Sequence, residues 1–178
     1  NVDFNGEMAI WMGTWNSWSD MGSELNNYFA NGTSAAEGFN KVWNCANHSL
    51  TALSVVRSNP NPNTDGGVLS FQSCTVNDGK SLADLVEADA KWNNFADTAG
   101  MSGGTYRMFP TAGIMEEDDD VDFWQMSAVS SLEAWGANAQ KYVDNSGGLV
   151  QASIYGDIVS CEDQEIYQAS SKRSASAN

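Results

Sequence analysis

The sequence predicts an α+β fold: one β-α-β-β-α-β unit with an antiparallel sheet, preceded by the second half of a similar unit. Two observations lead to this prediction. Segments with apolar residues at helical spacing alternate with short β-rich segments, and the chain resembles itself at one offset. We therefore divide the chain into a second half of a first repeat (1–58), a linker (59–67), a complete repeat (68–173) and a tail (174–178).

The internal repeat extends over a helix, a loop and a strand. Ser17 matches Ser131 at an offset of 114 residues, and Cys45 matches Cys161 at an offset of 116 residues. Residues 1–58 lack a counterpart of the first strand, helix and second strand, so we expect about 60 to 70 further residues before them. The alternative is that another molecule supplies the missing strands, which would make the protein a homo-oligomer.

The first half of the complete unit is predicted as strand, helix, strand. Residues 68–76 are rich in β-branched and apolar side chains and form the first strand. Ser81 and Asp84 are spaced as a capping box, and a helix follows as far as Gly100. The residues at its helical spacing are Leu82, Leu85, Val86, Asp89, Trp92, Phe95 and Ala96. A short strand over 104–109 is closed by Pro110.

The second half repeats this order after an acidic loop. A strand is predicted over 121–129, and a helix follows with Leu132, Trp135, Ala139 and Tyr142 facing inward. A short turn or helix near 151–157 precedes a last strand over 159–169. The complete order is the split βαβ arrangement of ferredoxin-like folds, in which the strands lie in the spatial order 4-1-3-2.

The predicted strand order brings two of the three cysteines together. Cys74 is near the end of the first strand and Cys161 near the start of the last, and these strands are antiparallel neighbours, so we expect a disulfide between them. Cys45 would pair with a cysteine outside this chain segment. The alternative, a nucleophilic Cys45 activated by His48, is disfavoured because residues three apart on a strand point to opposite faces. A disulfide implies an oxidising compartment, so the protein is expected to be secreted or periplasmic.

Charge and hydropathy exclude several kinds of partner. The chain has 23 acidic and 8 basic residues and a net charge of −15, which repels nucleic acid and anionic membrane surfaces. No apolar run approaches the roughly 20 residues of a membrane-spanning helix, so membrane insertion is not expected. No cofactor-binding motif is present, and no cofactor is predicted.

The layout resembles two fused units of the dimeric α+β barrel superfamily, which includes antibiotic-biosynthesis and haem-degrading monooxygenases. It also resembles uncharacterised marine bacterial proteins, through Cys74-Thr-Val-Asn-Asp-Gly-Lys-Ser81 and Lys91-Trp-Asn93. In the monooxygenases the pocket lies between the sheet and the helices and uses Trp, Asn, Tyr or His side chains. The resemblance implies Trp92, Asn93, Tyr106 and Trp124 as the matching residues, although packing in the core is favoured for them.

Two further groups of residues are candidates for chemistry. His48 is the only histidine and would be the default general base, but Gln164 holds the equivalent place in the complete repeat. Asp118, Asp120 and Asp122 could supply oxygen ligands to Ca²⁺. Because they lack the spacing of an EF-hand loop, a solvated acidic loop is favoured and no metal site is predicted.

These observations support two hypotheses about function. The first is an exported acidic module that binds a small apolar or aromatic ligand, or that serves a structural or assembly role. The alternative is a cofactor-independent monooxygenase or isomerase of the dimeric α+β barrel type, acting on an apolar or aromatic small molecule. The sequence contains no catalytic motif and leaves open whether the protein is an enzyme.

Overall fold

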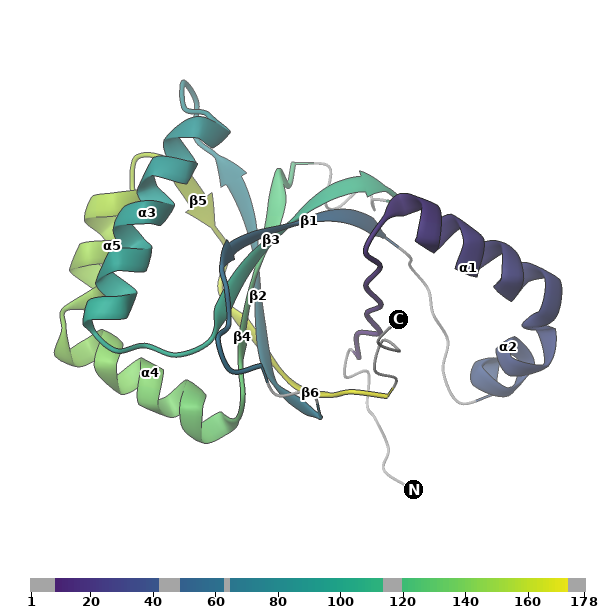
Figure 1. Cartoon of the computed structure of the whole chain (residues 1–178). Coiled ribbons are helices and arrows are strands. Elements are labelled where there is room, and N and C mark those ends of the chain that lie inside the picture. Colours follow the sequence, from purple (N-terminus) through teal and green to yellow (C-terminus); the bar gives the residue numbers. More distant parts are fainter. Residues whose placement is uncertain (1–8, 42–48, 63–64, 114–119, 173–178) are drawn as a thin grey trace. The chain divides into compact units, whose positions relative to one another are not determined.

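The computed structural model of the chain describes residues 9–41, 49–62, 65–113 and 120–172 (Figure 1). The chain divides into two compact units, the first over residues 1–46 and the second over residues 47–178. The first contains a pair of helices, and the second contains a sheet with its own helices.

In the first unit, helix α1 (Trp18–Asn31) is followed directly by the shorter helix α2 (Thr33–Asn40). The hydroxyl of Ser17 caps α1 by accepting a hydrogen bond from the Asp20 amide at 3.1 Å. A Cβ atom at Gly32 would lie 2.6 Å from the ring of Tyr28, so only glycine fits between the two helices.

The second unit is built on an antiparallel sheet, which has six strands in the described residues. These are β1 (Leu50–Arg57), β2 (Gly66–Val76), β3 (Gly104–Ala112), β4 (Phe123–Val129), β5 (Val159–Cys161) and β6 (Glu165–Ser170). The order is β1-β3-β4-β2, and both β5 and β6 pair with the far edge of β2. When the strands are numbered from β2, with β5 and β6 together counted as the fourth, this is the predicted order 4-1-3-2. The predicted α+β, ferredoxin-like fold class is confirmed.

Three helices lie together on one side of this sheet (Figure 1). They are α3 (Leu82–Thr98), α4 (Leu132–Asp144) and α5 (Gly147–Tyr155). The predicted capping box at the start of α3 is present, since Ser81 and Asp84 each bond the other's backbone amide. Leu85 of α3 packs against Cys74 and Phe123 of the sheet, and all three are fully buried.

The predicted disulfide between Cys74 and Cys161 is present and joins β2 to β5. The two residues face each other directly in the antiparallel register. Cys45 and its expected pairing lie outside the described residues. None of the helices in the described segments combines the length and apolar character needed to cross a membrane.

The last predicted strand is in fact two strands. Glu165 follows Cys161 by four positions, but their partners on β2, Phe71 and Cys74, are only three positions apart. The extra residue interrupts the pairing in the manner of a β-bulge. The strand predicted to close at Pro110 instead continues to Ala112. Among the described residues it pairs only with β1 beyond Met108, and proline is tolerated where one side of a strand is unpaired.

The strand expected at the end of the first repeat lies in the sheet of the second unit. β1 pairs with β3 from Leu50 to Arg57 and extends the four-stranded order by one strand. The tandem repeat itself stays a prediction. The helix pair α4 and α5 does share two local features with α1 and α2: a serine cap at Ser131, and a glycine, Gly147, whose added Cβ would clash with the preceding tyrosine Tyr142.

Candidate functional site

An ion pair is buried between α3 and β3. The guanidinium of Arg107 donates from Nη1 to Oδ2 of Asp89 at 2.5 Å and from Nη2 to Oδ1 at 2.6 Å. Arg107 is 4% exposed and Asp89 is 7% exposed. Charged groups are rarely buried to this extent unless they are paired, and this bidentate geometry is the strongest form of such a pair.

Two aromatic residues complete the surroundings of the ion pair. The hydroxyl of Tyr155, at the end of α5, donates to Oδ1 of Asp89 at 2.9 Å. Burial, and then the negative charge of Asp89, raise the pKa of Tyr155, so its hydroxyl stays protonated and remains a donor. The Cζ atom of Arg107 lies 5.0 Å from the centre of the Phe123 ring. The network thus joins α3, β3, β4 and α5.

A pocket of about 280 Å³ lies beside this network, between the edge strand β1 and helix α3. Its lining residues are Ser54, Val55, Val56, Leu82, Val86, Asp89, Ala90, Asn93, Arg107 and Phe109. Most of these residues are apolar, and Leu82 and Val86 are 50% and 65% exposed. The arrangement, apolar walls with a few polar groups, is typical of sites for small molecules.

Two polar atoms of the lining residues are buried and unsatisfied. Asn93 uses its Nδ2 amide to donate to the backbone oxygen of Val56 at 2.9 Å, but its Oδ1 has no hydrogen-bond partner among the described residues. Arg107 uses Nη1 and Nη2 on Asp89, and its Nε also lacks a partner within that part of the chain. Because a buried polar group without a partner is destabilising, such groups often mark the place of a ligand or an ordered water.

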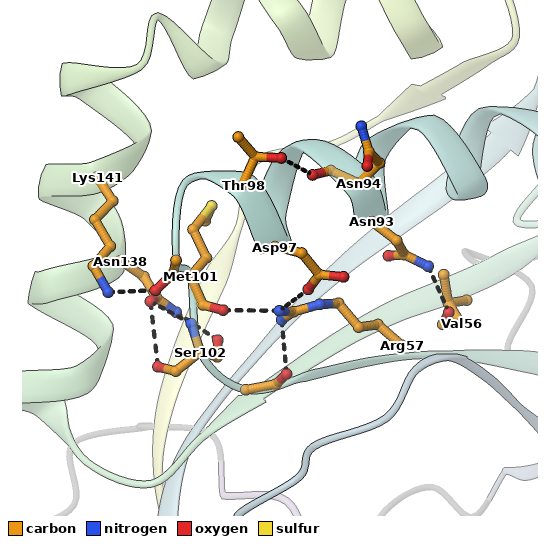
Figure 2. A network of polar contacts seen from close by, with 12 residues as sticks. Val56, Arg57, Asn93, Asn94, Asp97, Thr98, Met101, Ser102, Asn138 and Lys141 are labelled. Atoms are coloured by element: carbon orange, nitrogen blue, oxygen red, sulfur yellow. Dashed lines mark hydrogen bonds and ion pairs between the residues drawn. The ribbon is translucent and has the colours of Figure 1, made fainter.

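Strand β1, one wall of this pocket, is held in place by Arg57 (Figure 2). Its guanidinium donates to the backbone oxygens of Gly103 and Met101 at 2.9 and 2.8 Å and to Oδ1 of Asp97 at 2.8 Å. The same loop after α3 is held from the other side by α4, where Asn138 bonds the backbone of Ser102. The position of β1 therefore depends in part on contacts with the loop that follows α3.

We expect Arg57→Ala to lower the free energy of unfolding by about 2 to 3 kcal/mol, because it removes charge-assisted hydrogen bonds to two carbonyls. Asp97→Asn should cost less than about 1 kcal/mol, since the Asp97 carboxylate is 69% exposed and the pair is screened by water. Urea denaturation followed by circular dichroism measures both. Equal effects of the two substitutions would show that the ion pair, and not the carbonyl contacts, anchors β1.

One of the four residues implied by the resemblance lines the pocket. Asn93 does so, whereas Trp92 packs on the neighbouring helices, its ring 6.3 Å from that of Tyr142 on α4 and 6.1 Å from that of Tyr155 on α5. Tyr106 and Trp124 alternate with Arg107 and Phe123 along β3 and β4, and so point to the sheet face away from α3–α5. Sequence reasoning placed these residues on the right elements but did not separate the two faces of the sheet.

The remaining candidates lie elsewhere or outside the described residues. His48, Cys45 and Asp118 belong to segments that the structure does not describe. Asp122 accepts a hydrogen bond from the Val76 amide at 2.7 Å, and Asp120 contributes its backbone oxygen to Thr75. No group of three or more metal-binding side chains occurs in the described segments.

A larger hollow, of about 410 Å³, lies where β2 leads into α3. Its lining includes Asp78, Lys80 and Asp122. Asp122 binds the Val76 amide, and Oδ1 of Asn77 accepts from the Ser160 hydroxyl at 2.8 Å. Since its lining is more polar and includes three charged residues, this hollow is a weaker candidate for an apolar ligand than the pocket beside Arg107.

Sequence reasoning did not predict Asp89, Arg107 and Tyr155 as a network. One signal was available: Asp89 stands among apolar residues on the inward side of a predicted helix. A carboxylate at such a position requires a buried partner. The identity of that partner depends on which strand lies under the helix, and the sequence pattern does not contain this information.

The fold and the pocket together define an α+β unit of ferredoxin-like topology with a small-molecule-sized pocket at the edge of its sheet. No family model matches the sequence, and no curated protein matches it. The similarity to the dimeric α+β barrel families therefore stays a prediction.

Proposed function

We propose that this chain is an exported acidic module that binds a small apolar or aromatic molecule in the pocket between β1, β3 and α3. The observation that carries the proposal is the pocket itself, whose lining is mostly apolar and includes the polar residues Asp89, Asn93 and Arg107. Such a pocket can both desolvate an apolar ligand and orient it.

The disulfide supports the exported location. Cys74 and Cys161 form a bond that persists in oxidising compartments and is rare in the cytosol. The net charge of −15 keeps such a protein soluble and suits neutral ligands better than anionic ones. Secretion or a periplasmic location is therefore part of the proposal.

Toluene is a suitable probe of the pocket, because it is aromatic and has no polar group. We expect it to shift the backbone amide resonances of Val86, Ala90 and Asn93 in two-dimensional NMR spectra. Ala90→Phe should weaken toluene binding at least about tenfold, because the added ring occupies the pocket.

Ala83→Phe provides the matched control. Ala83 is exposed on the same helix but does not line the pocket, so the substitution has the same cost in helix propensity without filling the site. If toluene binds the Ala90→Phe and Ala83→Phe variants equally well, this pocket is not the binding site.

A structural or assembly role is the second candidate. It is favoured by the sheet face opposite α3–α5, where Phe71 and Tyr167 are in contact at 5.7 Å and Leu53 of the edge strand is 48% exposed. A second copy of the chain would bury this apolar face. A molar mass that stays at one chain over a hundredfold range of concentration, measured by light scattering, would rule out such assembly.

The catalytic alternative, a cofactor-independent monooxygenase or isomerase, is supported by the resemblance and by the place of the pocket between sheet and helix. The surroundings of the Asp89 carboxylate, which belongs to the pocket lining, do not favour this catalytic alternative. Both oxygens of Asp89 accept hydrogen bonds from Arg107, and Tyr155 donates a third. Three of the roughly four acceptor positions of this carboxylate are thus engaged within the protein. A general base needs a lone pair directed at its substrate, so binding is preferred to catalysis.

A further inference from the structure

We infer that the apolar group received by the pocket is a side chain of an extended, positively charged peptide, which adds a strand to the open edge of β1. The inference rests on the proposed function, because the pocket between β1 and α3 is the same one. It follows from three features of the described residues: the edge position of β1, the accessible side chains of α3 beside it, and the charge.

The backbone of β1 is available for pairing on one side. The strand lies at the end of the strand order, and among the described residues its only strand partner is β3. Its register with β3 is regular over residues 51–55, so alternate residues of this run direct their N–H and C=O groups to the open side. The run contains no charged residue and no proline, which commonly protect an exposed edge strand. An added strand would satisfy these backbone groups.

The side chains that would receive the ligand are accessible. Leu82, Val86 and Ala90 are spaced one helical turn apart on α3 and line the pocket together with Ser54 of β1. All four are exposed, so a ligand side chain can reach them without displacing protein atoms. The pocket volume of about 280 Å³ is small for a drug-sized ligand, for which roughly 300 to 1,000 Å³ is usual. It suits a single apolar side chain.

Direct contacts between α3 and β1 fix one end of this groove. Asn93 donates from Nδ2 to the backbone oxygen of Val56 at 2.9 Å, and Asp97 pairs with Arg57 at 2.8 Å (Figure 2). Val86 lies about two helical turns before Asn93 and is 65% exposed. The groove is therefore closed at the Asn93 end, and the anchoring side chain of the peptide is expected to contact Val86.

Charge favours a basic peptide over a second copy of this chain as the added strand. The chain has a net charge of −15, so two copies repel each other, whereas a positively charged peptide is attracted. The helix beside the groove follows the same trend: it exposes the carboxylates of Asp84, Glu87 and Asp97 and the ammonium group of Lys91. The occupant of the edge is therefore expected to carry lysine or arginine outside its anchoring side chain.

The probe that tests the inference is the peptide acetyl-Lys-Val-Thr-Val-Thr-Val-Lys-amide. One variant is N-methylated at both threonines and a second at the first two valines, so each lacks two N–H donors. Alternate residues of a strand direct their N–H groups to opposite sides, so only one variant loses the donors that face β1. Each hydrogen bond contributes on the order of a fivefold gain in affinity. In titration calorimetry we expect one variant to bind at least about tenfold more weakly than the unmodified peptide, and the other to bind nearly as well as it.

Two further comparisons locate the peptide and test its charge. Ala90→Phe should weaken binding of the unmodified peptide at least about tenfold, because the added ring fills the groove, whereas Ala83→Phe should not. A peptide with glutamate in place of both lysines should bind more weakly, and this difference should shrink as salt is added. Bound peptide should also slow hydrogen exchange at alternate amides of residues 51–55.

The outcomes separate this inference from the proposed function. If toluene binds in the pocket but the peptide does not bind, the pocket remains a ligand site and the inference is wrong. It is also wrong if the two N-methylated peptides bind alike, if Ala90→Phe and Ala83→Phe bind the peptide equally well, or if the glutamate peptide binds as tightly as the lysine peptide. Slow exchange at every amide of residues 51–55 in a dimeric free protein would show that a second copy occupies the edge instead. If neither toluene nor the peptide binds, the inference and the proposed function both fail.

Discussion

Asp89→Asn is expected to lower the free energy of unfolding by about 3 to 5 kcal/mol, the effect of removing one partner from a buried ion pair. The substitution leaves the guanidinium of Arg107 buried at 4% exposure without a compensating charge. It also weakens the acceptor of the Tyr155 hydroxyl. Urea denaturation with the disulfide intact, followed by far-ultraviolet circular dichroism, measures the loss.

Two variants show whether burial causes this effect. Asp97→Asn breaks an ion pair of the same chemistry whose carboxylate is 69% exposed, and it should cost less than about 1 kcal/mol. The double variant Asp89→Leu with Arg107→Met replaces both charges by apolar groups and should recover most of the stability lost in Asp89→Asn. An effect of Asp89→Asn no larger than that of Asp97→Asn would contradict the buried network.

Replacing both Cys74 and Cys161 with alanine is expected to lower the free energy of unfolding by about 4 to 5 kcal/mol. The disulfide closes a loop between residues separated by 87 positions, and the loss of this constraint increases the entropy of the unfolded chain. Cys74 is also 1% exposed and packs with Leu85 and Phe123, so its truncation leaves space in the core.

The measurement should be made with Cys45→Ala in both the reference and the double variant, so that no third thiol can exchange with the bond. Peptide mapping under non-reducing conditions should recover Cys74 and Cys161 in one linked peptide pair. If reduction of the reference protein leaves the denaturation midpoint unchanged, the disulfide does not stabilise the fold as we expect.

Much of the fold could be predicted because its signals are local. Ser81 and Asp84 marked the start of α3 through their spacing alone, and β2 was visible as a run of β-forming residues. The order of these elements then indicated which strands are neighbours. From that order the pairing of Cys74 with Cys161 followed, and the structure confirms it.

The pocket could be predicted only in part. Asn93 was identified through a resemblance, and Asp89 was noticed only as a member of a helical pattern. Nothing in the sequence indicated that Arg107 is buried, because an arginine in a strand usually faces solvent. Its burial results from the position of α3 across β3, which brings Asp89 onto it.

The sequence by itself determined the class of fold, the strand order and the disulfide, since these depend on periodicity, capping residues and the order of elements along the chain. The tertiary structure alone decided that β1 joins the sheet of the second unit beside β3, and that Arg107, Asp89 and Asn93 meet. The physical reason is the range of the interactions. Helix and strand patterns act between residues a few positions apart, whereas the ion pair links residues 18 positions apart and the contact of Asn93 with β1 spans 37.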